Sequence, residues 1–167
     1  MSLASVCTTA CLLFTTSVLL QGQPEEPKGP TQPIEFNHKL HVTDFKVACK
    51  MCHSNPDPGE MMDMPDVSTC TQCHSAIKPK DAAERKLEAF ARENRDIDWI
   101  RIYQIPSYVN FSHRAHLRAG ADCQTCHGPV GERTRLWKEK DVSMGTCMDC
   151  HRARRASIDC SYCHEPR

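Results

Sequence analysis

Ten of the twelve cysteines belong to a five-residue motif, Cys-x-x-Cys-His, which occurs five times in the chain. Two cysteines at this spacing can form thioethers with the two vinyl groups of one porphyrin, and the histidine that follows can bind the iron from one side. The sequence therefore predicts five covalently attached c-type haems. The predicted thioether residues are Cys49, Cys52, Cys70, Cys73, Cys123, Cys126, Cys147, Cys150, Cys160 and Cys163. The predicted proximal ligands are His53, His74, His127, His151 and His164.

Zinc ribbons and disulfides are the two alternative uses of such cysteines. A zinc site gives no reason for histidine to follow every cysteine pair, and a disulfide framework gives no reason for histidine at all. Five copies of the complete motif therefore favour haem attachment over both alternatives.

Four histidines lie outside the motifs, and all four fall in two matching segments of the form Phe-x-His-x-x-His. The first segment contains His38 and His41, and the second contains His113 and His116. Residues three apart on a helical turn lie on nearly the same face, so each pair can serve two neighbouring haems. We expect these four histidines to be distal axial ligands.

The nine histidines are one short of the ten axial ligands that five haems would need. The remaining haem is therefore His/Met, His/other or five-coordinate, and methionine would raise its reduction potential. The expected ligand is Met144, three residues before Cys147, although it could instead only pack against a porphyrin. The competing methionines are Met51, Met61, Met62, Met64 and Met148.

The segments that position these residues form a degenerate duplication. A dihaem unit at 34–80 and a trihaem unit at 107–167 each open with the Phe-x-His-x-x-His segment. A connecting helix and linker at 81–106 joins the units, with a helix expected over 81–94 and Asp81 as its N-cap. Pro106 should prevent a helix in the part-extended stretch that follows.

The first twenty residues contain no charged side chain and read as a signal peptide or a membrane anchor. A lipid anchor would need Cys7 or Cys11. Residues 21–33 are rich in proline and are expected to form an extended tether.

Composition limits both the fold and the partners. Aromatic residues make up only 6% of the chain, so it has few residues with which to build an apolar core. We expect mostly loop with short α-helices around a haem core, and little or no β-sheet. The formal net charge is zero, which gives no support for nucleic-acid binding.

The Phe-x-His-x-x-His segment followed by Cys-x-x-Cys-His resembles the cytochrome c3 and c7 superfamily. The runs at 99–116 and 144–152 look like the pentahaem subunit of bacterial alternative complex III, and this likeness covers residues 33–167. The resemblance implies a periplasmic position on the inner membrane, beside iron–sulfur and membrane subunits. It also implies electron relay from quinol oxidation to a monohaem cytochrome or another soluble acceptor.

The expected function is electron transfer as a subunit of a respiratory or photosynthetic quinol-oxidising complex, and not catalysis by this chain alone. Haem iron does the redox chemistry, while the protein sets spacing, ligands and solvent access. Two alternatives are a free periplasmic or extracellular carrier and a multihaem reductase that uses one open haem site.

Overall fold

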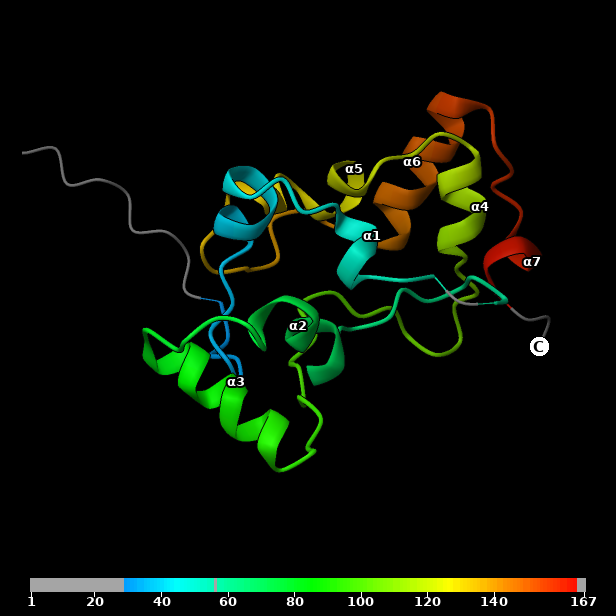
Figure 1. The fold of residues 1–167 in the computed structure, drawn as a ribbon. Helices are drawn as coiled ribbons and strands as arrows, with labels where there is room; N and C mark the ends of the chain where they lie inside the picture. The colour runs from blue at the N-terminus through cyan, green and yellow to red at the C-terminus, as the bar shows by residue number, and fades with distance from the viewer. Residues whose placement is uncertain (1–28, 56, 165–167) are drawn as a thin grey trace, which may run out of the picture.

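The computed structural model describes residues 29–55 and 57–164 as short helices joined by long loops (Figure 1). In these residues the helical elements are η1 (Lys39–Asp44), α1 (Cys49–Cys52), α2 (Val67–His74), α3 (Ala82–Arg92), α4 (His113–Arg118), α5 (Cys123–His127), η2 (Val130–Glu132), α6 (Met144–Arg154) and α7 (Cys160–Cys163). The described part of the chain contains no strand, and its one isolated β-bridge joins Val109 to His164. The predicted fold class, short helices without a sheet, is confirmed.

Several helices begin at a polar cap, which pairs one of the first backbone N–H groups that have no partner inside the helix. Asp66 accepts a hydrogen bond from the N–H of Thr69 at the start of α2. Asp122 does the same for Thr125 in α5, and Ser143 for Thr146 in α6. Each cap lies just before a Cys-x-x-Cys-His motif and so fixes where the motif helix begins.

Helix α3 carries an apolar stripe that includes Leu87 and Phe90, and it lies within the predicted range of 81–94. Asp81 is its N-cap, as expected, and accepts a hydrogen bond from the N–H of Glu84 at 2.8 Å. No helix follows between 95 and 112, which agrees with the expected effect of Pro106.

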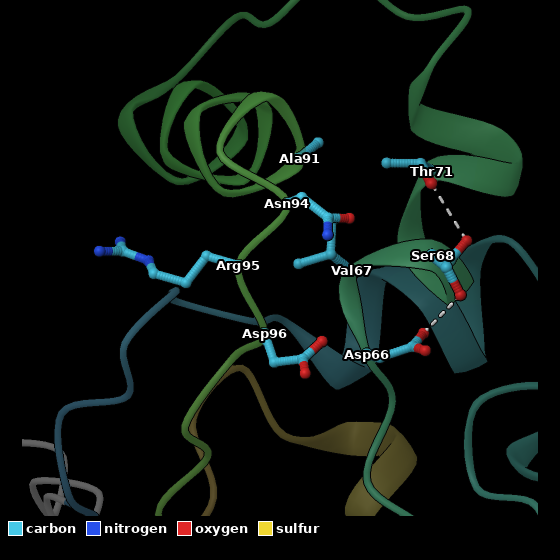
Figure 2. Close-up of a pocket in the computed structure, with 8 residues that line it drawn as sticks. All are labelled: Asp66, Val67, Ser68, Thr71, Ala91, Asn94, Arg95 and Asp96. Atoms are coloured by element: carbon cyan, nitrogen blue, oxygen red, sulfur yellow. Dashed lines mark hydrogen bonds between the residues drawn. The ribbon is translucent and has the colours of Figure 1, made fainter.

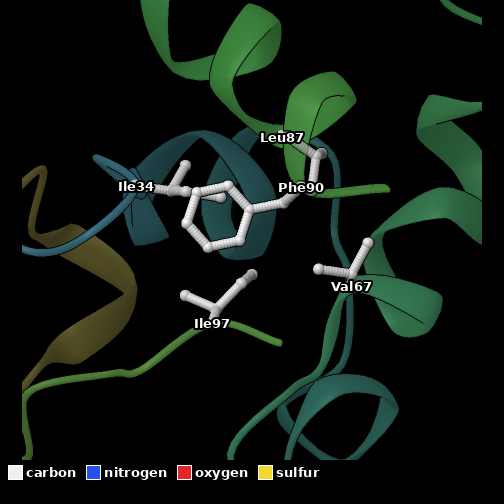
Figure 3. Packing of buried hydrophobic residues seen from close by; sticks show 5 residues of the cluster. All are labelled: Ile34, Val67, Leu87, Phe90 and Ile97. Atoms are coloured by element: carbon white, nitrogen blue, oxygen red, sulfur yellow. The ribbon is translucent and has the colours of Figure 1, made fainter. Parts of the chain in front are cut away.

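The buried hydrophobic core is small and lies where α3 meets α2 (Figure 3). In the described residues its members are Ile34, Val67, Leu87, Phe90 and Ile97. No described side chain is less than 2% exposed. An all-protein core this small cannot stabilise the other helices, which therefore need further apolar contacts such as a haem would supply.

The elements from the two predicted units pack against each other. The η1 turn lies against η2, with hydrogen bonds from the Lys39 N–H to the Arg133 carbonyl and from the Thr43 hydroxyl to the Gly131 carbonyl. The chain therefore folds back so that the start of the first unit meets the middle of the second.

The predicted signal or anchor at 1–20, and most of the tether at 21–33, lie outside the described residues. Within residues 29–55 and 57–164, no helix combines the length and the apolarity that crossing a bilayer requires.

Candidate haem-binding sites

Each of the five motifs is on its own short helix: α1, α2, α5, α6 and α7. A single helical turn brings the two cysteines of a motif to one side, and in α1, α2, α5 and α7 the histidine is at or just beyond the helix end, whereas His151 lies inside α6. All ten motif cysteines are free thiols and are exposed or half-buried. The arrangement leaves every thiol pair available for thioether formation.

The nine histidines share one type of position, since every one of them is half-buried. Six of them have Nδ1 within hydrogen-bonding distance of a backbone carbonyl. A bond of this kind from Nδ1–H fixes the tautomer and leaves Nε2 as the free ligand atom. The six pairs are His41 with Asn37, His53 with Asp63, His113 with Glu60, His116 with Ser112, His151 with Ser157, and His164 with Tyr108.

Three histidine pairs face each other across similar gaps. The ring centres are 6.1 Å apart for His41 and His74, 6.4 Å for His113 and His127, and 6.0 Å for His116 and His151. Because an imidazole nitrogen binds a metal at about 2.0 Å and lies roughly 1 Å from the ring centre, two imidazoles on opposite sides of one iron have centres about 6 Å apart. The observed spacings therefore fit six-coordinate haem iron.

The fourth non-motif histidine, His38, lies near His53. The pKa of His38 is lowered to about 4, first by burial and then by the neighbouring charges of His53 and His41. Its Nδ1 is buried without a hydrogen-bond partner. A buried ring nitrogen without a hydrogen-bond partner is costly to the folded protein, which makes His38 a candidate functional residue.

His164 remains without a facing histidine, because the other non-motif rings lie against motifs one to four. Its ring centre is 6.0 Å from that of Tyr108. A phenolate oxygen lies much farther from its ring centre than an imidazole nitrogen does, so a tyrosine opposite His164 on one iron would require about 8 Å. Tyr108 therefore packs beside His164 and does not have the spacing of a trans ligand.

The duplication is visible in the packing of two phenylalanines. Phe36 stacks on His41 at 4.4 Å and meets His38 edge-on at 4.8 Å. Phe111 stacks on His116 at 4.5 Å and meets His113 edge-on at 4.8 Å. In both units one ring thus orients two histidines. Both phenylalanines were expected as members of the repeated segment, but this role was not predicted; their constant position two residues before the first histidine was the available signal.

Tyr103 is a second residue whose role was not predicted. Its ring meets His127 edge-on at 4.7 Å, and its hydroxyl accepts hydrogen bonds from the N–H groups of Glu139 and Lys140, each at 3.0 Å. It joins the 139–140 loop to a motif histidine far from it in sequence. No local pattern around Tyr103 predicts this contact.

Met144, the predicted tenth ligand, is the first residue of α6 and its side chain is 65% exposed. It lies one turn before Cys147 and therefore on nearly the same helix face. The pKa of the Cys147 thiol is raised, first by burial and then by the thiols of Cys126 and Cys163. The helix face that carries Met144 thus lies near the third motif, through Cys126, and near the fifth, through Cys163.

Two hollows in the described residues differ in their relation to the motifs. One lies between α2 and the loop after α3; its lining includes Asp66, Asn94 and Asp96 but no motif cysteine or histidine (Figure 2). The other is an open cavity of about 550 Å³ between the first motif and α4. Its lining includes Lys50, Arg114 and Arg118, whose positive charges suit the propionates of a haem.

The part of the chain that the structure describes contains no cluster of side chains arranged to bind a metal ion without a haem. There, no three His, Cys, Asp or Glu side chains converge as they would around a zinc ion.

The motif helices, the fixed histidine tautomers and the facing imidazole rings together define a multihaem c-type cytochrome. Comparison with known families agrees with this class. Residues 17–101 match the class III cytochrome c family, and residues 109–165 match cytochrome c7 and related cytochromes c. The chain belongs to the class III cytochrome c family.

The chain is also similar to a protein from Nitratidesulfovibrio vulgaris, described as a menaquinone reductase, multihaem cytochrome c subunit. The two are 27% identical over 161 residues, which covers 80% of this chain and 77% of the relative. The predicted cytochrome c3/c7 relationship is therefore confirmed.

Proposed function

We propose that the chain is a pentahaem c-type cytochrome that relays electrons as a subunit of a membrane-associated, quinone-linked complex. The observation that carries this proposal is the set of facing histidine rings, 6.0–6.4 Å apart, beside motif cysteines that are all free. This spacing has no use in a zinc or disulfide protein and suits iron held between two imidazoles.

The proposed ligand assignment follows the facing rings for the second, third and fourth haems, and the proximity of His38 to His53 for the first. His38 and His53 serve the first haem, His41 and His74 the second, His113 and His127 the third, and His116 and His151 the fourth. His164 is the proximal ligand of the fifth. The ten motif cysteines, from Cys49 to Cys163, hold the haems covalently.

Bound haem would supply one-electron chemistry at iron. The histidines of the chain would hold the haem iron, because the six whose Nδ1 is hydrogen-bonded to a backbone carbonyl keep Nε2 free to bind it. Two histidines opposite each other leave no coordination position for a substrate. This suits relay between redox partners, and in the proposal the chain by itself is not an enzyme.

The fifth haem differs because no histidine faces His164. Met144 is proposed as its second ligand, since its side chain is exposed and Cys147, one turn further along the same helix, has Cys163 of the fifth motif as well as Cys126 of the third among its neighbours. Replacing Met144 with leucine should remove the near-infrared Met–iron charge-transfer band, while the same change at half-buried Met148 in α6 should retain it. A band that survives in the Met144 variant would exclude this residue.

An open position on the fifth haem is the second candidate, and the missing histidine is the observation that favours it. High-spin ferric iron in the untreated protein, with cyanide binding to one haem of five, would support an open site. A fully low-spin spectrum would exclude it.

The proposed complex draws on two similarities. The relative's description connects this kind of subunit to menaquinone, and the runs at 99–116 and 144–152 resemble the pentahaem subunit of alternative complex III. On these grounds the proposed partners are iron–sulfur and membrane subunits, with a monohaem cytochrome or another soluble acceptor downstream. The proposed location is the periplasmic side of the inner membrane.

Affinity purification from detergent-solubilised membranes of the native host tests the complex. Co-purification with an iron–sulfur protein and a polytopic membrane protein is expected, as is haem reduction upon addition of a reduced quinol analogue. Recovery of the chain alone from the soluble periplasmic fraction, with haems that a quinol does not reduce, would contradict the proposal and favour a free carrier.

A further inference from the structure

The two halves of the chain meet through the loop that follows the first motif. The backbone N–H and Nδ1 of His113 lie 3.2 Å and 2.7 Å from the Glu60 carbonyl oxygen, and the Arg114 N–H donates to Gly59 at 2.9 Å. Gly59 has φ +88°, and a side chain there would collide with Arg114. The loop after motif one thus touches the helix that carries the distal histidines of the second unit.

The first and third motifs themselves are neighbours. The thiols of Cys49 and Cys123 are hydrogen-bonded to each other. The pKa of His127 is lowered, first by burial and then by His113 and His53. The proximal histidines of motifs one and three therefore lie in one region, although motif two separates them in sequence.

The second motif is also a neighbour of the first. His41, which is on η1 next to His38, faces His74 of motif two. The pKa of the Cys52 thiol is raised, first by burial and then by Cys73 of motif two. Beyond this contact α2 packs on α3, through Val67 and the apolar cluster, and α3 carries no haem motif.

The fourth motif lies beside the third, and the fifth lies beside the fourth. His113 and His116 both belong to α4. Their rings face those of His127 in α5 and His151 in α6. The thiol of Cys147 in motif four lies near Cys126 of motif three and Cys163 of motif five. The fifth motif is also tied to the chain before α4, because the Asn110 N–H donates to the Cys163 carbonyl at 2.8 Å.

We propose that the five haems are arranged in space in the order two, one, three, four, five, and not in the order of their motifs along the sequence. The inference rests on the proposed function only in that every motif carries a haem. The ends of the row are then the second haem, beside α3, and the fifth haem, which has no histidine facing His164.

This order specifies where electrons enter and leave. Electron tunnelling favours adjacent haems, so the electron route runs through the whole row and the partners dock at its two ends. The exposed side chains of Tyr108 and Tyr162 lie at the fifth-haem end, where aromatic side chains suit a protein interface.

The test uses the isolated holoprotein, and therefore does not depend on the partners of the proposed complex. Neighbouring haems alter each other's reduction potentials by charge interaction, which weakens with distance. Two variants each lack one haem: Cys49→Ala with Cys52→Ala for the first, and Cys70→Ala with Cys73→Ala for the second. Redox titration followed by electron paramagnetic resonance then gives the potential of the third haem in each.

We expect the third haem's potential to shift more when the first haem is missing than when the second is missing. Sequence order predicts the reverse, and that result would overturn the proposal. If a variant does not fold, nuclear magnetic resonance spectra of the unaltered ferrous protein can determine the haem order. Nuclear Overhauser cross-peaks should join the meso protons of haems one and three, and peaks joining haems two and three instead would refute the order. Failure of the proposed complex would appear only in the membrane purification and would leave these results unchanged.

Discussion

Replacing Phe111 with leucine should disturb two haems and leave the rest unchanged. The ring stacks on His116 at 4.5 Å with 25° between planes, and it meets His113 edge-on with 89° between planes. Leucine keeps most of the apolar volume but loses both ring contacts. At about 0.5–1.5 kcal/mol per aromatic contact, the free energy of unfolding should fall by about 1–3 kcal/mol. For a chain of this size, the melting temperature should fall by roughly 2–12 °C.

Electron paramagnetic resonance of the oxidised protein measures the local effect, because the angle between the two ligand planes controls the g-values of a low-spin haem. The ring planes are 7° apart for His113 and His127, and 41° apart for His116 and His151. Without Phe111 both distal rings gain freedom, so the signals of the third and fourth haems should shift or broaden.

The duplication provides the matched control, Phe36→Leu, which should change the haems of His38 and His41 instead. The two variants should therefore alter different subsets of signals. The reasoning is refuted if both variants alter the same signals, or if Phe111→Leu lowers the melting temperature without changing any g-value.

Three further changes test the protein framework. Tyr103→Phe removes the acceptor of two backbone N–H groups and should cost about 1–2 kcal/mol, measured by denaturant unfolding; an unchanged midpoint would show that water replaces the hydroxyl. Leu87→Ala should destabilise the chain by about 2–5 kcal/mol because it empties part of the small core, while exposed Glu88→Ala should stay within about 0.5 kcal/mol. Asp66→Ala removes the cap of α2 and should cost about 0.5–2 kcal/mol; full recovery of stability in Asp66→Ser would confirm the capping role, and no recovery would contradict it.

Features encoded by neighbouring residues were predictable from the sequence. The apolar spacing of Leu87 and Phe90, with Asp81 before them, sufficed to predict α3 and its cap. The motif spacing predicted a c-type cytochrome because thioether formation needs both cysteines and the histidine within one helical turn. These are contacts over a few residues, where spacing in sequence determines spacing in the fold.

Features that depend on how the chain folds back were not predictable. His113 and Glu60 are 53 residues apart, and Tyr103 is 36 residues from Glu139. No local pattern encodes such contacts, and the same holds for the distal histidine that faces each motif. The assignment of Met144 stays a prediction, because its partner would be the iron of a haem attached elsewhere in the chain.

The mass of the intact holoprotein under denaturing conditions tests the central claim most directly, because only covalently attached haem survives denaturation. We expect one dominant species, heavier than its own processed polypeptide by five haems, with five irons per chain by metal analysis. A species with four or fewer haems, or one that loses its haem on denaturation, would contradict it.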